Sequence, residues 1–266
     1  GEIWGYETDG YYTINDFNAD DAKHKTWTLK EGVVKINGYN PQPGDVKFKD
    51  LRTDGVINAG DNTVDNPGDR KIIGNDAARY QFGISLGASY KGWSLEVLLQ
   101  GVGKRDYWLG GPAMFLFGGA GAGDAVFQAL YANQTDYWRA KSYDPSSSDY
   151  MVPVNPDSKL FRIYDQGNNV GSNTRVSDKY LQNAAYMRIK NITLAYTLPK
   201  EWVRRAFIQD AKFYLSIENL ATFSSLPKGY DPEGTAPSST ANALSNGISW
   251  GYPYYRTISL GASITF

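Results

Sequence analysis

The last ten residues constrain the fold of the chain more than any other segment. From Thr257 to Phe266, every even-numbered residue is apolar and every odd-numbered residue is small or polar. Successive side chains of a β-strand point to opposite faces, so this alternation predicts a strand with one apolar face and one polar face. A half-buried edge strand of a soluble β-sandwich would have the same pattern. This strand alone therefore leaves open both a sandwich and a membrane barrel.

Four further segments repeat the alternation. Residues 80–90 and 93–100 flank the turn-like pair 91–92, which predicts a β-hairpin with a short turn. Residues 191–197 and 212–218 have the same pattern. Aromatic side chains stand at or near the ends of several apolar stripes, as the interfacial girdle of a transmembrane barrel requires.

The lengths of the connections favour the membrane barrel. If Phe266 marks the periplasmic end, strand directions alternate backwards from it, and the short turns 91–92 and 199–210 are periplasmic. All the long connections then lie outside the cell, at about residues 7–79, 104–184 and 224–254. Short periplasmic turns and long extracellular loops are typical of outer-membrane barrels, whereas a soluble sandwich has no reason to sort its loops in this way.

Composition agrees with a membrane protein built from strands. Mean hydropathy is -0.47, and no apolar run approaches the roughly 18 residues of a membrane helix. A transmembrane strand needs only about 10 residues, of which every second one is apolar. The net charge of -1 provides no electrostatic footprint for nucleic acid. The absence of Cys excludes disulfides, thiolate metal sites and Cys nucleophiles.

The number of strands is too small for a closed barrel. The alternation predicts five strands, and a sixth could end near Trp4. An open sheet edge in lipid leaves backbone groups unpaired, at several kcal/mol each. We therefore expect further strands from sequence outside the chain. Residues 1–4 also lack the basic and apolar regions of a signal peptide.

Blocks along nearly the whole chain resemble the C-terminal third of SusC/RagA-type TonB-dependent transporters. The blocks occur in the order of the family, and only residues 104–180 match poorly, as expected for a variable loop. The matching blocks are residues 1–6 (GEIWGY), 43–50 (PGDVKFKD), 68–75 (GDRKIIGN), 79–83 (RYQFG), 100–106 (QGVGKRD), 186–199 (YMRIKNITLAYTLP), 218–220 (ENL), 229–233 (GYDPE) and 256–257 (RT).

The resemblance implies an all-β fold, in which the chain forms the C-terminal strands of a transmembrane antiparallel barrel of roughly 22 strands with a plugged lumen. It implies the bacterial outer membrane, active import of oligomers (glycan first, peptide as the alternative), and a SusD-like surface lipoprotein as partner. The plug, the N-terminal strands and the contact with the TonB complex would lie upstream of this chain. Phe266 would belong to the signal read by the barrel-assembly machinery.

Residues 50–61 resemble an EF-hand calcium loop, with Gly55 at position 6. Arg52 departs from that pattern, because it brings a positive charge to position 3, where a carboxylate or an amide belongs. The alternative is a Gly-rich acidic turn without metal. The Ca²⁺ ligands would be Asp50, Asp54, the carbonyl of Val56, Asn58 and Asp61.

Aromatic residues of the 104–184 connection are candidates for contact with cargo or partner. Aromatic faces stack on sugar rings, and the nearby glycines would let the loop fold inward. Packing on the plug or on the lipoprotein is the alternative. The candidates are Tyr107, Trp108, Phe115, Phe117, Tyr131, Tyr137 and Trp138.

An enzymatic function has no support in the sequence. His24 is the only histidine and lies among charged residues, and no Gly-x-Ser-x-Gly motif is present. Besides a SusC-type importer, two functions stay open. A TonB-dependent siderophore or cobalamin receptor would lack the SusD-like partner, and a soluble carbohydrate-binding β-sandwich would fold without detergent.

Overall fold

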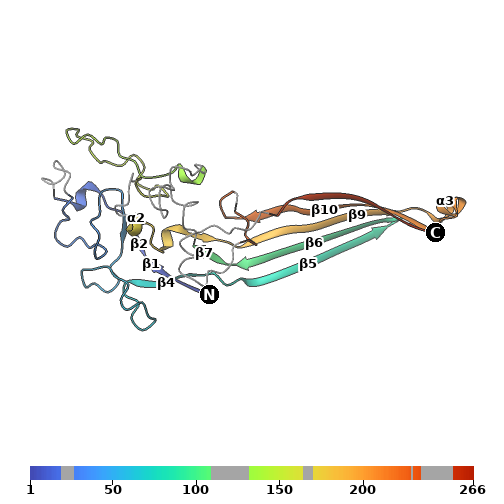
Figure 1. The fold of residues 1–266 in the computed structure, drawn as a ribbon, viewed down its shortest axis with the longest axis horizontal. Helices are drawn as coiled ribbons and strands as arrows, with labels where there is room; N and C mark the ends of the chain where they lie inside the picture. Colours follow the sequence, from blue (N-terminus) through green and yellow to red (C-terminus); the bar gives the residue numbers. More distant parts are fainter. Residues whose placement is uncertain (19–26, 109–131, 164–169, 229, 235–253) are drawn as a thin grey trace. The chain divides into compact units, whose positions relative to one another are not determined.

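The computed structural model describes residues 1–18, 27–108, 132–163, 170–228, 230–234 and 254–266 (Figure 1). The chain divides into two compact units. In its described part, unit 1 comprises residues 1–76 and 107–182, and unit 2 comprises residues 77–106, 183–236 and the last strand with its flanks. No helix among the described residues has the length and apolar character needed to cross a membrane.

Unit 2 is a five-stranded antiparallel sheet with the order β11-β10-β9-β6-β5 (Figure 1). All five strands predicted from the alternation are confirmed. Their bounds are β5 (Arg79–Tyr90), β6 (Trp93–Lys104), β9 (Tyr186–Thr197), β10 (Asp210–Ser224) and β11 (Thr257–Thr265).

The predicted hairpin turn between β5 and β6 is also confirmed. Tyr90 pairs with Trp93, and the two residues between them have positive φ angles, 46° at Lys91 and 84° at Gly92. Positive φ at both central residues is the geometry of a two-residue turn whose twist matches that of the flanking strands. The connection from β9 to β10, at the same end of the sheet, contains the short helix α3 (Lys200–Val203) and the 3-10 turn η5 (Arg204–Ala206).

Side chains of the five strands form rows across one face of the sheet, because residues opposite each other in adjacent strands point to the same side. The row nearest the hairpin turn contains Tyr90, Trp93, Tyr196 and Phe213. The row at the other end contains Phe82, Met187 and Phe223. Between them lie aliphatic rows such as Leu95, Leu194, Leu215 and Leu260, or Val97, Ile192, Ile217 and Ile258. This face, the apolar face below, is exposed: Leu260 is 84% accessible and Ile258 65%.

A bulge in β9 reverses the alternation. The register between β6 and β9 shifts at Lys190, which has no partner in β6. On the turn side of the bulge Ile192 lies on the apolar face, and beyond it Ile189, opposite Leu99, lies there instead. Arg188 is therefore directed to the opposite, polar face, where its side chain is only 2% exposed.

Unit 1 is built from short strands and long connections. β1 (Glu2–Tyr6) pairs with β4 (Arg70–Asn75), and β2 (Thr8–Tyr11) pairs with β3 (Val46–Phe48). The strand expected near Trp4 therefore exists as β1, but it pairs within unit 1. A further pair joins β7 (Asp106–Trp108) to β8 (Leu181–Asn183). The short helical turns are η1 (Ile14–Asp16), η3 (Ala132–Gln134), α2 (Val170–Asn173) and η4 (Asp178–Tyr180).

The core of unit 1 is aromatic. The rings of Phe17 and Trp27 meet edge to face at 5.3 Å between centroids. Trp138 is 1% exposed and packs against Gly44, where a Cβ atom would lie 2.6 Å from the indole and φ is +93°. Only glycine meets both conditions, the left-handed backbone and the close approach. The core also contains a buried polar pair, in which Asn173 Nδ2 donates to Asp45 Oδ1 over 2.7 Å.

Candidate functional site

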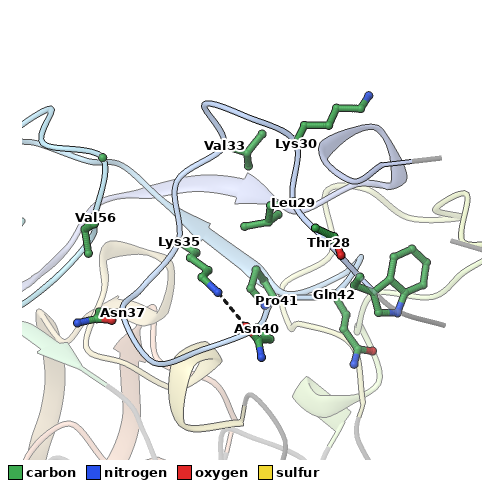
Figure 2. Close-up of a pocket in the computed structure, with 12 residues that line it drawn as sticks. Thr28, Leu29, Lys30, Val33, Lys35, Asn37, Asn40, Pro41, Gln42 and Val56 are labelled. Carbon is green, nitrogen blue, oxygen red and sulfur yellow. Dashed lines mark hydrogen bonds between the residues drawn. The ribbon is translucent and has the colours of Figure 1, made fainter. Parts of the chain in front are cut away.

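Unit 1 contains a cavity of about 770 Å³ that is open to solvent (Figure 2). Its lining comes from two stretches, residues 27–42 and 55–56. A volume of this order is typical of pockets that hold small molecules or single units of an oligomer. The cavity is therefore the candidate ligand-binding pocket of the described residues, and is called the unit 1 pocket below.

Polar side chains of the unit 1 pocket are mostly amides. Asn37, Asn40 and Gln42 line it, and each amide offers both donors and acceptors. Lys35 Nζ donates to Asn40 Oδ1 over 2.8 Å, and Figure 2 shows the Lys35 side chain pointing at Asn40 while Lys30 extends away. The described lining contains no Asp or Glu. The amides and the lysine can form hydrogen bonds with the hydroxyls of a sugar or with the backbone amides of a peptide. A ligand with an acidic group would meet no carboxylate in the described lining.

Trp27 gives the pocket an aromatic wall that is held in place on two sides. Its ring stacks on Tyr150 at 6.0 Å with an interplanar angle of 20°, and it meets Phe17 edge to face. The segment beside it is fixed by Tyr12, whose hydroxyl donates to the carbonyl of Val34 over 2.6 Å. Burial raises the pKa of the Tyr12 phenol, so the hydroxyl remains a donor at any ordinary pH.

The two stretches of the pocket lining are joined through a backbone bridge. Ile57 N donates to the carbonyl of Lys35, and Asn37 N donates to the carbonyl of Ile57, both over 3.1 Å. Ile57 is fully buried. In the calcium-loop pattern Ile57 is the apolar anchor, so the 50–61 loop and the pocket are parts of one substructure.

Side chains of the 50–61 loop accept hydrogen bonds from backbone N–H groups of the same loop. Asp50 Oδ2 accepts from Gly55 N over 2.7 Å, Asp54 Oδ1 from Val56 N over 3.1 Å, and Asn58 Oδ1 from Gly60 N over 2.8 Å. Partial burial raises the pKa of Asp50, but backbone N–H donors including Gly55 outweigh it and hold the pKa below the usual value. Asp61 accepts from Asn66 Nδ2 instead of turning inward.

Asp69, which the loop motif does not include, closes this loop. It is fully buried and accepts backbone N–H groups from Leu51, Arg52 and Asn58 at 3.1, 3.2 and 2.8 Å. Arg52 places Nη2 2.9 Å from Asp54 Oδ2 and Nε 3.9 Å from Asp69 Oδ1. The Arg52 guanidinium therefore lies near one carboxylate of the loop, Asp54, and near the carboxylate of Asp69. Among the described residues no group of three or more His, Asp or Glu side chains converges as a metal site. Calcium binding stays a prediction.

The aromatic residues predicted to contact cargo or partner differ in burial and surroundings. Trp138 is a core residue, and Trp108 and Tyr107 are also buried, at 4% and 8% exposure. The Trp138 indole packs on Gly44 in this structure, and contact of these residues with a ligand or partner stays a prediction. Tyr137 is half-buried beside Arg139, whose guanidinium carbon is 5.7 Å from the ring centroid. Phe115, Phe117, Tyr131 and His24 lie outside the described residues.

The polar face of unit 2 holds an ion-pair network that sequence patterns did not reveal. Arg188 Nη2 is 2.8 Å from both carboxylate oxygens of Asp231, and Glu233 is 3.2 Å from Arg188 Nη1 and 2.9 Å from Lys190 Nζ. Tyr254 packs over Arg188 at 5.1 Å, and its N–H donates to Asp231. The network therefore fixes both ends of the connection between β10 and β11. The matching blocks at 186–199 and 229–233 contain its two cations and its two acids, but neither block indicated that they pair.

Comparison with known proteins finds that the chain is similar to TonB-dependent receptors. TonB-dependent receptor P3 of Formosa agariphila is 26% identical over 273 residues, covering 100% of this chain and 22% of the receptor. TonB-dependent receptor P26 of the same organism is 24% identical over 244 residues, covering 91% of the chain and 22% of the receptor. No model of a protein family matches the chain.

Solved structures give the same fold. The structure of the RagAB peptide importer in the open-open state matches with a TM-score of 0.51 at 19% identity, and a second RagAB peptide transporter structure with 0.51 at 20%. Each match covers 100% of this chain and 22% of the other chain. The chain thus spans about a fifth of the length of the proteins it matches, and these are receptors and importers rather than enzymes.

Proposed function

We propose that the chain forms part of the barrel wall of an importer that takes up oligomeric nutrients across the outer membrane, because its sequence is similar to TonB-dependent receptors and its fold is similar to that of the RagAB importer. The chain supplies five neighbouring strands of the wall. The remaining strands, the plug and the contact with the TonB complex belong to sequence outside the chain.

The apolar face of unit 2 is the observation that most supports this proposal. Its aliphatic rows are bounded by aromatic side chains at both ends, with Trp93 in one outer row and Phe82 in the other. Eight residues of β6 separate the two outer rows, which at about 3.4 Å per residue is about 27 Å. The apolar band of an outer-membrane barrel is about 25 Å tall between two aromatic girdles. The face thus has the height and the borders that a bilayer requires.

The opposite face fits a hydrated lumen. Facing side chains of β9 and β10 are hydroxyls and amides: Asn191 Nδ2 donates to Ser216 Oγ over 3.0 Å, and Thr193 pairs with the same hydroxyl at 3.1 Å. The Arg188 network lies on this side as well. In lipid such groups would be costly, so the two faces define the orientation of the wall. The proposal also places the long connections at about 7–79, 104–184 and 224–254 outside the cell, because outer-membrane barrels have short periplasmic turns and long extracellular loops.

The unit 1 pocket is the proposed contact for cargo or for a SusD-like surface lipoprotein. Its amides and the fixed Trp27 ring suit a glycan unit, and the same amides suit a peptide backbone. RagAB, which shares the fold, is described as a peptide importer. We place glycan first because a rigid aromatic wall beside three amides matches a sugar ring, with peptide as the alternative. No observation favours a siderophore or cobalamin as cargo.

The test is affinity purification of the whole receptor from its own outer membrane in detergent, with mass spectrometry of the proteins that copurify. We expect the chain to require detergent and to copurify with a SusD-like lipoprotein. A chain that is folded and soluble without detergent would contradict the barrel wall. A receptor recovered without any surface lipoprotein would favour a receptor of the siderophore or cobalamin type.

Cargo class is tested by growth on defined glycan or peptide mixtures. The variant Lys35→Gln combined with Asn37→Ala and Gln42→Ala should slow uptake, because it removes polar contacts of the unit 1 pocket. Lys159→Gln, an exposed lysine of unit 1 away from the pocket lining, is the control. Equal uptake by both variants would exclude the pocket from cargo handling.

A further inference from the structure

The connection from β9 to β10 exposes apolar and cationic side chains together. Trp202 is 64% exposed and Phe207 is 93% exposed, whereas Val203 between them is buried. Figure 1 shows α3 at the end of the sheet where the chain ends. The turn is thus attached through Val203 and presents its aromatic rings outward, which would be unfavourable in water.

Backbone strain maintains the exposure of Phe207. Its φ angle is +58°, in the left-handed region that aromatic residues rarely adopt. Two hydrogen bonds hold this conformation: Phe207 N donates to the carbonyl of Arg204, and Ile208 N donates to the carbonyl of Val203, both over 3.2 Å. A conformation that costs free energy and exposes an aromatic ring indicates that the ring meets something other than water.

Three cations surround these rings. Lys200, Arg204 and Arg205 lie in α3 and η5, against the single acid Glu201. None of the three cations forms an ion pair within the described part of the chain. By contrast, Lys190 on the same sheet is fully engaged with Glu233. The turn therefore presents uncompensated positive charge beside exposed aromatic rings.

A cavity lies at the same turn. It has a volume of about 760 Å³ and is lined by Lys200, Arg204 and Phe207, with Asp210 as the only acid of its described lining. Two cations against one carboxylate leave the cavity with a net positive charge. Arg and Lys side chains bind phosphate oxygens through charge-assisted hydrogen bonds, and an aromatic ring beside them suits the boundary between headgroups and acyl chains.

We propose that this turn binds the phosphate of a glycerophospholipid headgroup, with Lys200 and Arg204 on the phosphate and with Trp202 and Phe207 in the interfacial layer. The inference rests on the proposed function, because it places the turn at the periplasmic surface of the membrane. The row with Trp93 and Tyr196, whose rings meet at 4.7 Å, lies on the strands next to this turn and continues the same interface. The bound lipid would anchor the barrel wall at this edge.

The experiment is native mass spectrometry of the whole receptor after delipidation in detergent and titration with phosphatidylglycerol. We expect Lys200→Gln/Arg204→Gln to bind the lipid about tenfold more weakly for each cation removed. The matched control is Lys159→Gln/Lys228→Gln, which removes two exposed lysines elsewhere and should leave lipid binding unchanged. Equal lipid binding by the double variant and the wild type would overturn the site.

Phe207→Gly separates a loss of the site from a loss of the fold. Glycine adopts positive φ without strain, so this variant should be at least as stable as the wild type in thermal unfolding while binding less lipid. Unchanged lipid binding by this variant would contradict the role of the ring.

Inorganic phosphate is the competing occupant. If phosphate alone raises the thermal stability as much as the lipid does, the site binds an ion rather than a headgroup, and the proposal fails. Failure of the proposed function has a different signature, which is a receptor that folds and remains soluble without any detergent.

Discussion

The two units of this chain use apolar side chains in opposite ways. In unit 1, Trp138, Phe17 and Ile57 are at most 1% exposed; Trp138 packs on Gly44, and Phe17 packs on Trp27. In unit 2, Leu260, Tyr90 and Ile258 are 84%, 71% and 65% exposed. Unit 1 therefore buries these apolar side chains within itself. Unit 2 instead exposes a continuous apolar face that would lie against a medium other than water. Regular rows with aromatic borders distinguish such a face from a poorly packed surface.

Polar groups are buried in both units where partners satisfy them. Unit 1 buries Asp69, which accepts a backbone N–H from Asn58, and Asn173, which donates to Asp45. Unit 2 buries Arg188 almost completely on its polar face. Burial of a guanidinium is tolerable because Asp231 and Glu233 surround it. The medium on each side of a surface, rather than composition, decides which side chains a unit exposes.

The largest expected effect is in the core of unit 1. Trp138→Ala should destabilise unit 1 by about 3–5 kcal/mol, because truncation of a buried aromatic leaves a cavity. Val64→Ala, at a position that is 76% exposed in the same unit, should change stability by less than about 0.5 kcal/mol. Denaturant unfolding of the receptor, followed by protease cleavage within unit 1, measures both. Similar effects of the two variants would contradict a self-contained core.

Removal of Arg188 should have a comparable effect on unit 2. Arg188→Met leaves Asp231 buried without a cation and leaves Glu233 with Lys190 alone, a change that costs about 3–5 kcal/mol in other proteins. The triple variant Arg188→Met/Asp231→Leu/Glu233→Leu removes the uncompensated charges and should recover part of the loss. Thermal unfolding in detergent compares the variants. A single variant as stable as the wild type would mean that the network does not fasten the β10–β11 connection.

Charge on the apolar face tests what medium covers it. Ile258 lies in the central row, so Ile258→Arg should cost about 2–4 kcal/mol when the barrel is folded in vesicles. Ser259→Arg, one residue along on the polar face, is the matched control and should be tolerated. If neither substitution changes the folding free energy, the apolar face is in contact with water, and the proposed difference between the two units is wrong.

Sequence reasoning succeeded where the signal is local. Alternation with period two predicts each strand from its own residues, and Lys91 with Gly92 predicts the turn between β5 and β6. It failed where the direction of a side chain depends on pairing between segments that are distant in the sequence. The bulge at Lys190 is defined only by the register with β6, so the direction of Arg188 could not be read from its own strand.

The candidate site shows the same limit. The calcium-loop spacing predicted Asp50, Asp54 and Asn58 as Ca²⁺ ligands, which stays a prediction; in the structure each one accepts a backbone N–H within the loop. The spacing did not identify Asp69, because that residue reaches the loop from outside the motif. The packing of Trp138 on Gly44 could not be predicted either, because nothing in the segment around Trp138 indicates it.

Arg52 offers a smaller and more specific test. Its guanidinium lies where the calcium pattern requires an oxygen ligand, so Arg52→Asn should increase the affinity of the loop for Ca²⁺. At calcium concentrations about 100-fold above the dissociation constant, binding would stabilise the folded state by about 2.7 kcal/mol. Thermal unfolding with calcium or with a chelator measures this shift. A wild-type protein that responds as strongly as the variant would show that Arg52 does not block the ion.

The smallest effect concerns pH. Glu7 in unit 1 forms ion pairs with Lys49, over 2.6 Å, and with Lys71, and the hydrogen bonds of these two lysines lower its pKa from 4.5 to about 2. A lowered pKa contributes stability above the unfolded value of 4.5 that is lost as the pH falls towards 2. Because the pair is exposed, the contribution is small and screened by salt. The wild type should therefore lose slightly more stability than Glu7→Gln between pH 5 and pH 2, at low ionic strength only. Parallel pH profiles at low salt would show that this ion pair adds nothing to unit 1, whose stability would then rest on its aromatic core alone.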